Sequence, residues 1–279
     1  MNPELSIAYL EWLPHIKKLD TPRYLAILRS PRALQPLLAA LTQFHFSLAE
    51  IAESSSDPMI CAIRLAWWAE ACDALKNGII SKPHPVLLAL ASDAASGKLD
   101  ANLLLNMIAS REYELDASLL NTASDFNSYI DGSIGALHVA WAQLLTPYPL
   151  SDSKKDAIIM LSRGFAIMRL LLAIPALAQK RMLRFSESDM AEFGLSHSSE
   201  SISHPCENLE ALCQAMSEKA RDFLNAATPF YKALPAPLRV LYKFAMSDMA
   251  RLKKAQYNPY DALCHRPHPL RDVLIAMRS

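Results

Sequence analysis

The chain has 279 residues, of which 28 are lysine or arginine and 28 are aspartate or glutamate, so its formal net charge at pH 7 is +0. This balance excludes a strongly basic nucleic-acid-binding protein, and any charged ligand must be met by a local group of side chains. Only six residues are glycine and 18 are proline, which favours helices separated by prolines. We expect one all-α domain over residues 1–279.

The first clear elements form a pair of helices. Leu37, Leu41, Phe44, Leu48 and Ile51 are spaced by threes and fours and predict a helix over residues 36–53, which SSSDP ends. A second stripe, through Ile60, Ile63, Trp67, Ala71 and Ala74, predicts a helix that stops at Asn77-Gly78. Further helices are predicted over residues 83–96, 101–115, 133–145, 156–174, 208–227, 237–255 and 269–279.

Two of these segments, residues 133–145 and 156–174, are apolar around most of their circumference, so we expect them at the centre of a bundle. The serine-rich stretch HSSESISHPCE, residues 197–207, is predicted to be a flexible loop. No pattern typical of strands competes with this organisation.

The N-terminus, MNPELSIAYLEWLPHIKK, lacks the basic start and apolar core of a secretory signal. The longest apolar run, residues 165–178, contains Arg169 and Pro175 and is shorter than the roughly 20 residues that cross a bilayer. The five cysteines show no CxxC spacing, which favours reduced thiols. We therefore expect a cytoplasmic protein with neither a signal peptide nor a transmembrane helix.

Two segments place lysines and arginines beside apolar residues. HIKKLDTPRYLAILRSPRALQP, residues 15–36, carries five lysines or arginines against the single acid Asp20. The C-terminal helix carries Leu270, Val273, Leu274 and Met277 beside Arg271 and Arg278. Both are typical of solvated helix faces and equally of charge-dependent binding to anionic lipid.

The stretch CAIRLAWWAEACDALKNG, residues 61–78, sets Arg64 one turn before Trp68. The side chains of Trp67 and Trp68 point about 100° apart on a helix, so one faces the interior and the other a helix–helix seam. Structural packing is one interpretation. The alternative is the wall of a ligand cavity, with Arg64 as an anion contact.

Two carboxylate pairs have i, i+3 spacing, namely Glu50 with Glu53 and Glu70 with Asp73. Such pairs are typical of solvated helix faces. They also suit a Mg²⁺ and diphosphate site between helices, because Mg²⁺ prefers hard oxygen ligands.

The segment FHFSLAEIAESSSDPMICAIRLAWWAEACDALKNG, followed by HPVLLAL, resembles the RLxWW and HPV region of squalene and phytoene synthase-like proteins. REYELDA, YIDGSIGALHVAWAQLL and GFAIMRLLLAIPALAQKRMLRFSESDMAEFGLS are similar to later segments of the same family, so the resemblance covers about residues 24–275. It implies an isoprenoid synthase fold, a helical bundle around a central apolar cavity. Active members join two prenyl diphosphates head to head, with Mg²⁺ held by two aspartate-rich motifs.

Both motifs are altered at the positions that the resemblance assigns to them. The first holds Ala49, Glu50 and Glu53, and the second holds Ala173 and Leu177. Without metal and cationic contacts the diphosphate leaving group is not stabilised. The pattern is closest to a branch that contains a mitochondrial complex I assembly factor and its bacterial relatives, which implies a pseudoenzyme.

We therefore expect a non-catalytic protein, located in the cytoplasm or peripherally at the inner face of a membrane, that binds an isoprenoid or other lipid, or a partner protein. No cofactor and no nucleic acid are expected. One alternative is an active head-to-head prenyltransferase that uses Mg²⁺ with Glu50, Glu53, Glu70 and Asp73 as its catalytic carboxylates. Another is a scaffold whose own side chains fill the cavity. The candidates for cavity or ligand-binding residues are Leu37, Phe44, Leu48, Arg64, Trp67, Trp68 and Met168.

Overall fold

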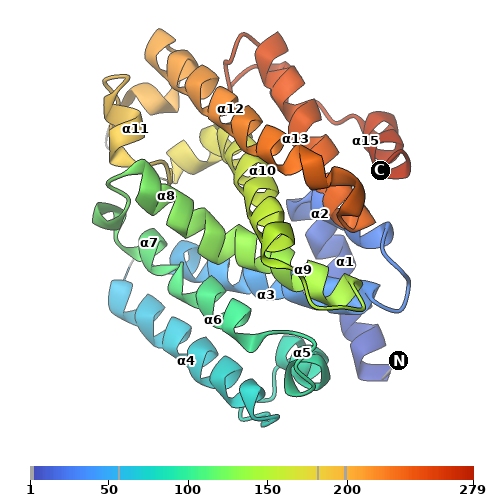
Figure 1. The fold of residues 1–279 in the computed structure, drawn as a ribbon. Helices are drawn as coiled ribbons and strands as arrows, with labels where there is room; N and C mark the ends of the chain where they lie inside the picture. Colours follow the sequence, from blue (N-terminus) through green and yellow to red (C-terminus); the bar gives the residue numbers. More distant parts are fainter. Residues whose placement is uncertain (1–2, 56, 181, 198–199) are drawn as a thin grey trace.

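The computed structural model describes residues 3–279 except 56, 181 and 198–199, and it is built from helices (Figure 1). No strand occurs within residues 3–55, 57–180, 182–197 and 200–279. The expected all-α class is therefore confirmed.

Figure 1 draws the first half of the chain in blue through cyan to green. Its elements are α1 (Pro3–Leu19), α2 (Thr21–Leu28), α3 (Gln35–Ser54), α4 (Pro58–Lys76), α5 (Pro85–Ala95), α6 (Ala101–Ala109), α7 (Glu112–Leu115) and the 3₁₀ turn η1 (Ala117–Leu119).

The second half begins with α8 (Ala123–Ile130), a π-helical turn η2 (Asp131–Gly135) and α9 (Ala136–Leu145), which together form one continuous rod. The remaining helices are α10 (Asp152–Gln179), α11 (Glu187–Ala191), α12 (Glu207–Ala227), α13 (Ala236–Lys254), α14 (Ala262–His265) and α15 (Pro269–Met277), with 3₁₀ turns at η3 (Glu200–Ser203) and η4 (Thr228–Ala233).

Local chemistry explains where many helices begin. Asp20, Asp57 and Asp100 each accept a hydrogen bond from a backbone N–H of the first turn that follows them, which satisfies a donor with no partner inside the helix. Proline occupies the first turn of α2, α3, α4, α5, α13 and α15, where its fixed φ and missing N–H are tolerated.

Helices α9 and α10 lie at the centre of the bundle, as their apolar sequences predict. Every residue of α9 from Ala136 to Ala142 is buried, and α10 crosses the molecule against α12 and α13 (Figure 1). Gly164 permits the close contact between α10 and α12, because a Cβ there would lie 2.6 Å from Cγ of Leu224 and 2.9 Å from the carbonyl oxygen of Ala220.

Helix α10 is longer than the apolar run suggested. With 28 residues it is long and apolar enough to cross a membrane by length and composition, but 67% of its most apolar stretch is buried inside the bundle. A buried core helix passes the same test, so this is weak evidence for a membrane span.

The predicted flexible loop at residues 197–207 includes 198–199, which lie outside the described residues. Within the rest of it, the 3₁₀ turn η3 places the Ile202 side chain in the core. The hydroxyl of Tyr260 donates to the carbonyl oxygen of Ile202 over 2.6 Å, so this part of the loop packs against the C-terminal region.

Candidate functional site

A cavity of about 190 Å³ lies between the C-terminal half of α3, the α6–α7 junction, the α8–η2 rod and α10. Its walls combine apolar and polar side chains. The lining residues are His45, Ala49, Glu53, Arg111, Glu114, Tyr129, Ser133, Ile134, Leu170, Leu177, Met182 and Arg184.

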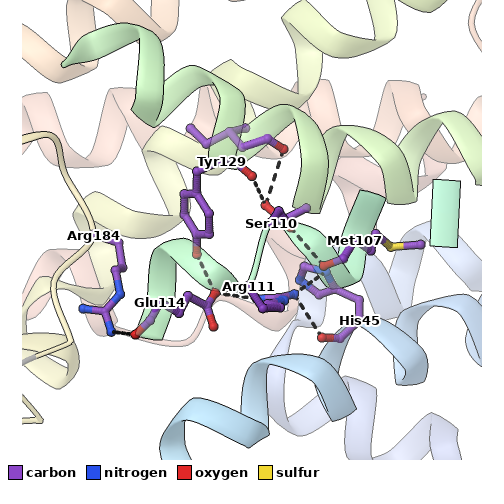
Figure 2. A network of polar contacts seen from close by, with 9 residues as sticks. His45, Met107, Ser110, Arg111, Glu114, Tyr129 and Arg184 are labelled. Carbon is purple, nitrogen blue, oxygen red and sulfur yellow. Dashed lines mark hydrogen bonds and ion pairs between the residues drawn. The ribbon is translucent and has the colours of Figure 1, made fainter. Parts of the chain in front are cut away.

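A connected polar network occupies one wall of this cavity (Figure 2). Arg111 donates from Nη1 to Oε1 of Glu114 over 2.5 Å, and from Nη2 to Nδ1 of His45 over 3.0 Å. The Tyr129 hydroxyl donates to the same Glu114 oxygen over 2.7 Å, and Arg184 donates to the Glu114 carbonyl oxygen over 2.9 Å. The Arg111 and Glu114 side chains are only 4% and 8% exposed, so each charge depends on the other.

Burial fixes the protonation states within this network. The pKa of His45 is lowered well below its usual value, first by burial and then by the charge of Arg111. The pKa of Tyr129 is raised, first by burial and then by Glu114. At neutral pH the imidazole is therefore neutral and the phenol is protonated, and both polar groups already have partners within the protein.

The positions that the resemblance assigns to the first metal motif lie at or near the cavity. Ala49 and Glu53 line it. The Glu53 carboxylate accepts from Nζ of Lys180 over 2.5 Å, whereas Glu50 is exposed and lies 3.8 Å from the His15 ring.

The positions assigned to the second motif offer no metal ligand. Leu177 lines the cavity, and Ala173 lies one turn before it on α10, half-buried. Neither side chain carries an oxygen. Together, the positions assigned to the two motifs place one carboxylate in the cavity wall, that of Glu53, which is already paired with Lys180. The two motifs therefore do not fit a pair of Mg²⁺ ions held from two sides.

The alternative site built from four carboxylates is not assembled. Glu70 pairs with Lys82 over 2.6 Å and Asp73 pairs with Lys76 over 3.1 Å, both on the exposed side of α4. Only Glu53 of the four faces the central cavity. Among the residues that the structure describes, no group of three or more His, Cys, Asp or Glu side chains could hold a metal ion.

Several of the candidate cavity residues lie in the packed core. Phe44, Leu48 and Met168 are completely buried, and Leu37 is half-buried. Trp68 is buried and meets Phe44 edge to face, with ring centroids 5.2 Å apart. None of these side chains lines the central cavity, so their contacts are those of structural packing.

Arg64 and Trp67 require a correction, because both lie on the outer face of α4. The Arg64 guanidinium is exposed and donates to the hydroxyl of Ser54 over 2.6 Å. The Trp67 side chain is 37% exposed, with Nζ of Lys82 lying 5.1 Å from the ring centroid. Neither residue is positioned to contact an anion inside the bundle.

The sequence did not single out Arg111, Glu114, Tyr129 or Arg184 as site residues. The segment REYELDA stands out only as a family resemblance. Arg111 and Glu114 in this segment are i, i+3 neighbours, a spacing that surface helices also show. The partner that distinguishes them, His45, lies 66 residues earlier in the chain.

An all-helical bundle with a cavity walled by α3, the α8–η2 rod and α10 has the architecture of an isoprenoid synthase. Solved structures share this fold. A dehydrosqualene synthase in complex with a ligand superposes with a TM-score of 0.81 at 16% identity, covering 99% of this chain and 96% of that one. The squalene synthase HpnC from Alicyclobacillus acidocaldarius superposes with a TM-score of 0.75 at 15% identity, covering 93% and 98%.

The chain belongs to the squalene/phytoene synthase family, whose sequence profile matches residues 16–272. Among curated proteins it is similar to NADH dehydrogenase (ubiquinone) complex I, assembly factor 6, of Mus musculus, with 23% identity over 261 residues. That match covers 93% of this chain and 77% of the relative. The Rattus norvegicus protein of the same description is 23% identical over 262 residues, with the same coverage.

Proposed function

We propose that this protein is a non-catalytic member of its family that binds a lipid or a partner protein and supports the assembly of a respiratory complex. The observation that carries the proposal is the composition of the cavity wall. Where two facing sets of carboxylates would hold Mg²⁺, the chain places Ala49, Ala173 and Leu177 together with Glu53, which is paired with Lys180.

The electrostatics of prenyl condensation support this proposal. Two diphosphates bring roughly six negative charges into a poorly solvated space, where their repulsion is strong. In the cavity wall the charge of Arg111 is paired with that of Glu114, and Arg184 donates to the backbone carbonyl oxygens of Leu183 and Glu114. Loss of a single stabilising contact of this kind typically costs about 3–4 kcal/mol of barrier.

The size of the cavity also argues against two substrates. Its volume of about 190 Å³ is below the roughly 300–1,000 Å³ of pockets that enclose drug-sized ligands. A ligand in this space would be one narrow apolar chain, which fits a single isoprenoid or acyl tail better than a pair of prenyl diphosphates.

Incubation with labelled farnesyl or geranylgeranyl diphosphate and Mg²⁺ tests the absence of catalysis. An active squalene synthase run in parallel shows that the assay works, and we expect no condensed product from this protein. Product formation that Glu53→Ala abolishes would establish the alternative, a prenyltransferase with an unusual carboxylate site, and would overturn the proposal.

Thermal unfolding with and without farnesol or geranylgeraniol separates lipid binding from a scaffold with a filled cavity. If the cavity receives an apolar chain, the ligand raises the unfolding temperature and Ala49→Leu abolishes that shift. Ala176→Leu, at an exposed position of α10, is the matched control and retains it. No shift in the unaltered protein would contradict binding of these apolar ligands and favour the scaffold with a filled cavity.

Assembly is tested in cells that lack the chain, by native-gel analysis of the NADH dehydrogenase complex. The mammalian relatives motivate this experiment by their description as complex I assembly factors. We expect fewer assembled complexes without the chain and full rescue by Glu53→Ala and Glu70→Ala, because the role needs no catalytic carboxylate. Normal assembly in the deleted strain would contradict it.

We further propose that the protein acts in the cytoplasm and contacts the inner face of a membrane. The basic residues 15–36 and the amphipathic C-terminal helix support this location.

A further inference from the structure

Helix α15 presents its apolar stripe to solvent. Leu270, Val273, Leu274 and Met277 follow an i, i+3, i+4, i+7 pattern, and their exposed fractions are 83%, 46%, 47% and 69%. Such a stripe normally faces the core of a protein, yet the one buried residue that α15 contributes is Ala276, 7% exposed. The stripe is therefore an exposed apolar surface, a feature typical of interaction sites.

The opposite side of α15 packs on the bundle through Ile275 and Ala276, which belong to or contact the hydrophobic core. The helix lies against α2 and α13 at the edge of the molecule (Figure 1). Lys243 of α13 donates to the carbonyl oxygen of Arg278, and Arg271 pairs with its neighbour Asp272 over 2.7 Å. With Ile275 and Ala276 facing the core, the apolar stripe faces outward.

A basic pocket of about 270 Å³ opens beside the first turn of α15. Five lysine or arginine side chains line it against two aspartates, and it shares no lining residue with the central cavity. Its charged and titratable lining residues are Lys18, Arg169, Asp248, Arg251, His265, Arg266, His268, Arg271 and Asp272.

Both aspartates of this basic pocket are already paired with arginines that line the same pocket. Asp248 is buried between Arg169 and Arg251, with nitrogen–oxygen distances of 3.5 Å to each. Within the described residues, neither Lys18 nor Arg266 forms an ion pair. The unbalanced positive charge at the pocket therefore suits a ligand with at least one negative charge.

We propose that the α15 stripe and the basic pocket form one membrane-docking surface, in which the stripe enters the bilayer interface and the pocket receives the phosphate group of an anionic phospholipid. This inference rests on the proposed peripheral contact with a membrane and names the surface that makes it. Aliphatic side chains beside lysines and arginines match the acyl boundary and the charged headgroups of such a bilayer. Leu19, which is exposed and lines the pocket, extends the apolar surface to the end of α1.

Co-sedimentation with vesicles of phosphatidylcholine, with and without phosphatidylglycerol, tests the surface. We expect binding that requires phosphatidylglycerol and weakens as salt is added. Leu270→Ser combined with Leu274→Ser should weaken binding about tenfold or more, because two leucines no longer enter the interface. Lys18→Gln and Arg266→Gln should each weaken it about fivefold.

Matched control variants change the same residue types elsewhere on the surface. Met59→Ser combined with Ile63→Ser removes two exposed apolar residues from α4, and Lys154→Gln removes an exposed charge at the start of α10. These controls should bind vesicles as the unaltered protein does. All of the substituted side chains are exposed, and unchanged thermal unfolding checks that each variant is folded.

The possible outcomes distinguish a failure of the proposed docking surface from a failure of the proposed membrane contact. Absence of binding to any vesicle would overturn membrane contact itself. Binding that the α15 and pocket variants leave unchanged would overturn the surface inference while membrane contact stands. Binding of soluble glycerol 3-phosphate that depends on Arg266, without vesicle binding, would make the pocket a site for a free phosphate ester and would overturn the docking role.

Discussion

Arg111 donates a hydrogen bond of 3.0 Å from Nη2 to Nδ1 of His45, joining the α6–α7 junction to α3 across the interior (Figure 2). A guanidinium can only donate, so Nδ1 must accept and the imidazole must be neutral. A second proton on His45 would remove the acceptor and place two cations in contact. Burial and the Arg111 charge accordingly lower the pKa of His45.

This relationship predicts that the protein loses stability as the medium becomes acidic. In the unfolded chain His45 has a pKa of about 6.5, whereas its folded pKa is far lower. Above a pH of about 6.5 His45 is neutral in both states, so its contribution to the free energy of unfolding is present in full. As the pH falls below it, the unfolded state binds the extra proton and stability declines by up to about 1.4 kcal/mol per pH unit. His138, also buried with a lowered pKa, adds a loss of the same sign.

Urea unfolding between about pH 8 and pH 5 measures this loss. His45→Asn keeps an acceptor near Arg111 and removes one titrating group, so its stability should fall less steeply with pH. His204→Asn, at an exposed position, should leave the slope unchanged. Equal slopes for His45→Asn and the unaltered protein would refute the assignment of a neutral, buried His45.

Two ion pairs at the cavity should differ sharply in their contribution to stability. Removing Glu114 leaves Arg111 buried without its counter-charge, which typically costs about 3–5 kcal/mol. The Lys180–Glu53 pair is 54% and 42% exposed, so Lys180→Ala should cost within about 1 kcal/mol. Denaturant unfolding of Glu114→Ala and Lys180→Ala makes the comparison. Similar losses in the two variants would contradict the burial described here.

The boundaries of α3 and the start of α4 were predictable because they depend on local chemistry. The helix predicted over residues 36–53 is α3, Gln35–Ser54. The next helix begins at Pro58, directly after the predicted break. Caps, prolines and apolar spacing act within a few residues of each boundary, so the sequence itself displays them.

The inward face of α4 was not predictable in the same way. The predicted stripe through Ile60, Ile63, Trp67, Ala71 and Ala74 begins with three exposed side chains, Ile60, Ile63 and Trp67. The buried residues of α4 are Cys61, Leu65, Trp68, Ala71, Cys72 and Leu75, so most of the buried face lies one residue, or about 100°, from that stripe. Because both faces of this helix carry apolar side chains, only tertiary packing decides which one is covered.

The polar network was unpredictable for a related reason. Its partners come from helices far apart in sequence, and charged residues such as Arg111 and Glu114 are mostly exposed in proteins. Only the assembled fold shows that this pair is buried.

Cys72 should be unreactive in the folded protein. Burial raises the pKa of its thiol to about 12, so the thiolate, which is the reactive form, is scarce near neutral pH. Alkylation with N-ethylmaleimide, followed by peptide mass spectrometry, should leave Cys72 unmodified in buffer and label it in urea. Rapid labelling in buffer would show that α4 opens readily from the bundle.

Gly164 should be intolerant of a side chain, because α12 leaves no room for one there. A Cβ would meet both Leu224 and the backbone oxygen of Ala220, so Gly164→Ala should destabilise by about 1–3 kcal/mol, despite the better helix propensity of alanine. Leu224→Ala removes one of the two clashes. In a double-mutant cycle measured by urea unfolding, the combined loss should therefore be smaller than the sum of the single losses by at least about 0.5 kcal/mol.

Gly97→Ala separates this packing effect from backbone strain. Gly97 has a φ of +74°, and a Cβ at this position would meet no other atom within 4 Å, so alanine there is strained by its backbone alone. The stability lost in Gly97→Ala should add to the stability lost in Leu224→Ala without coupling, since the two sites share no contact. Strict additivity for Gly164→Ala as well would mean that α12 moves to accept the methyl group, and that the close approach of the two helices is not required by the fold.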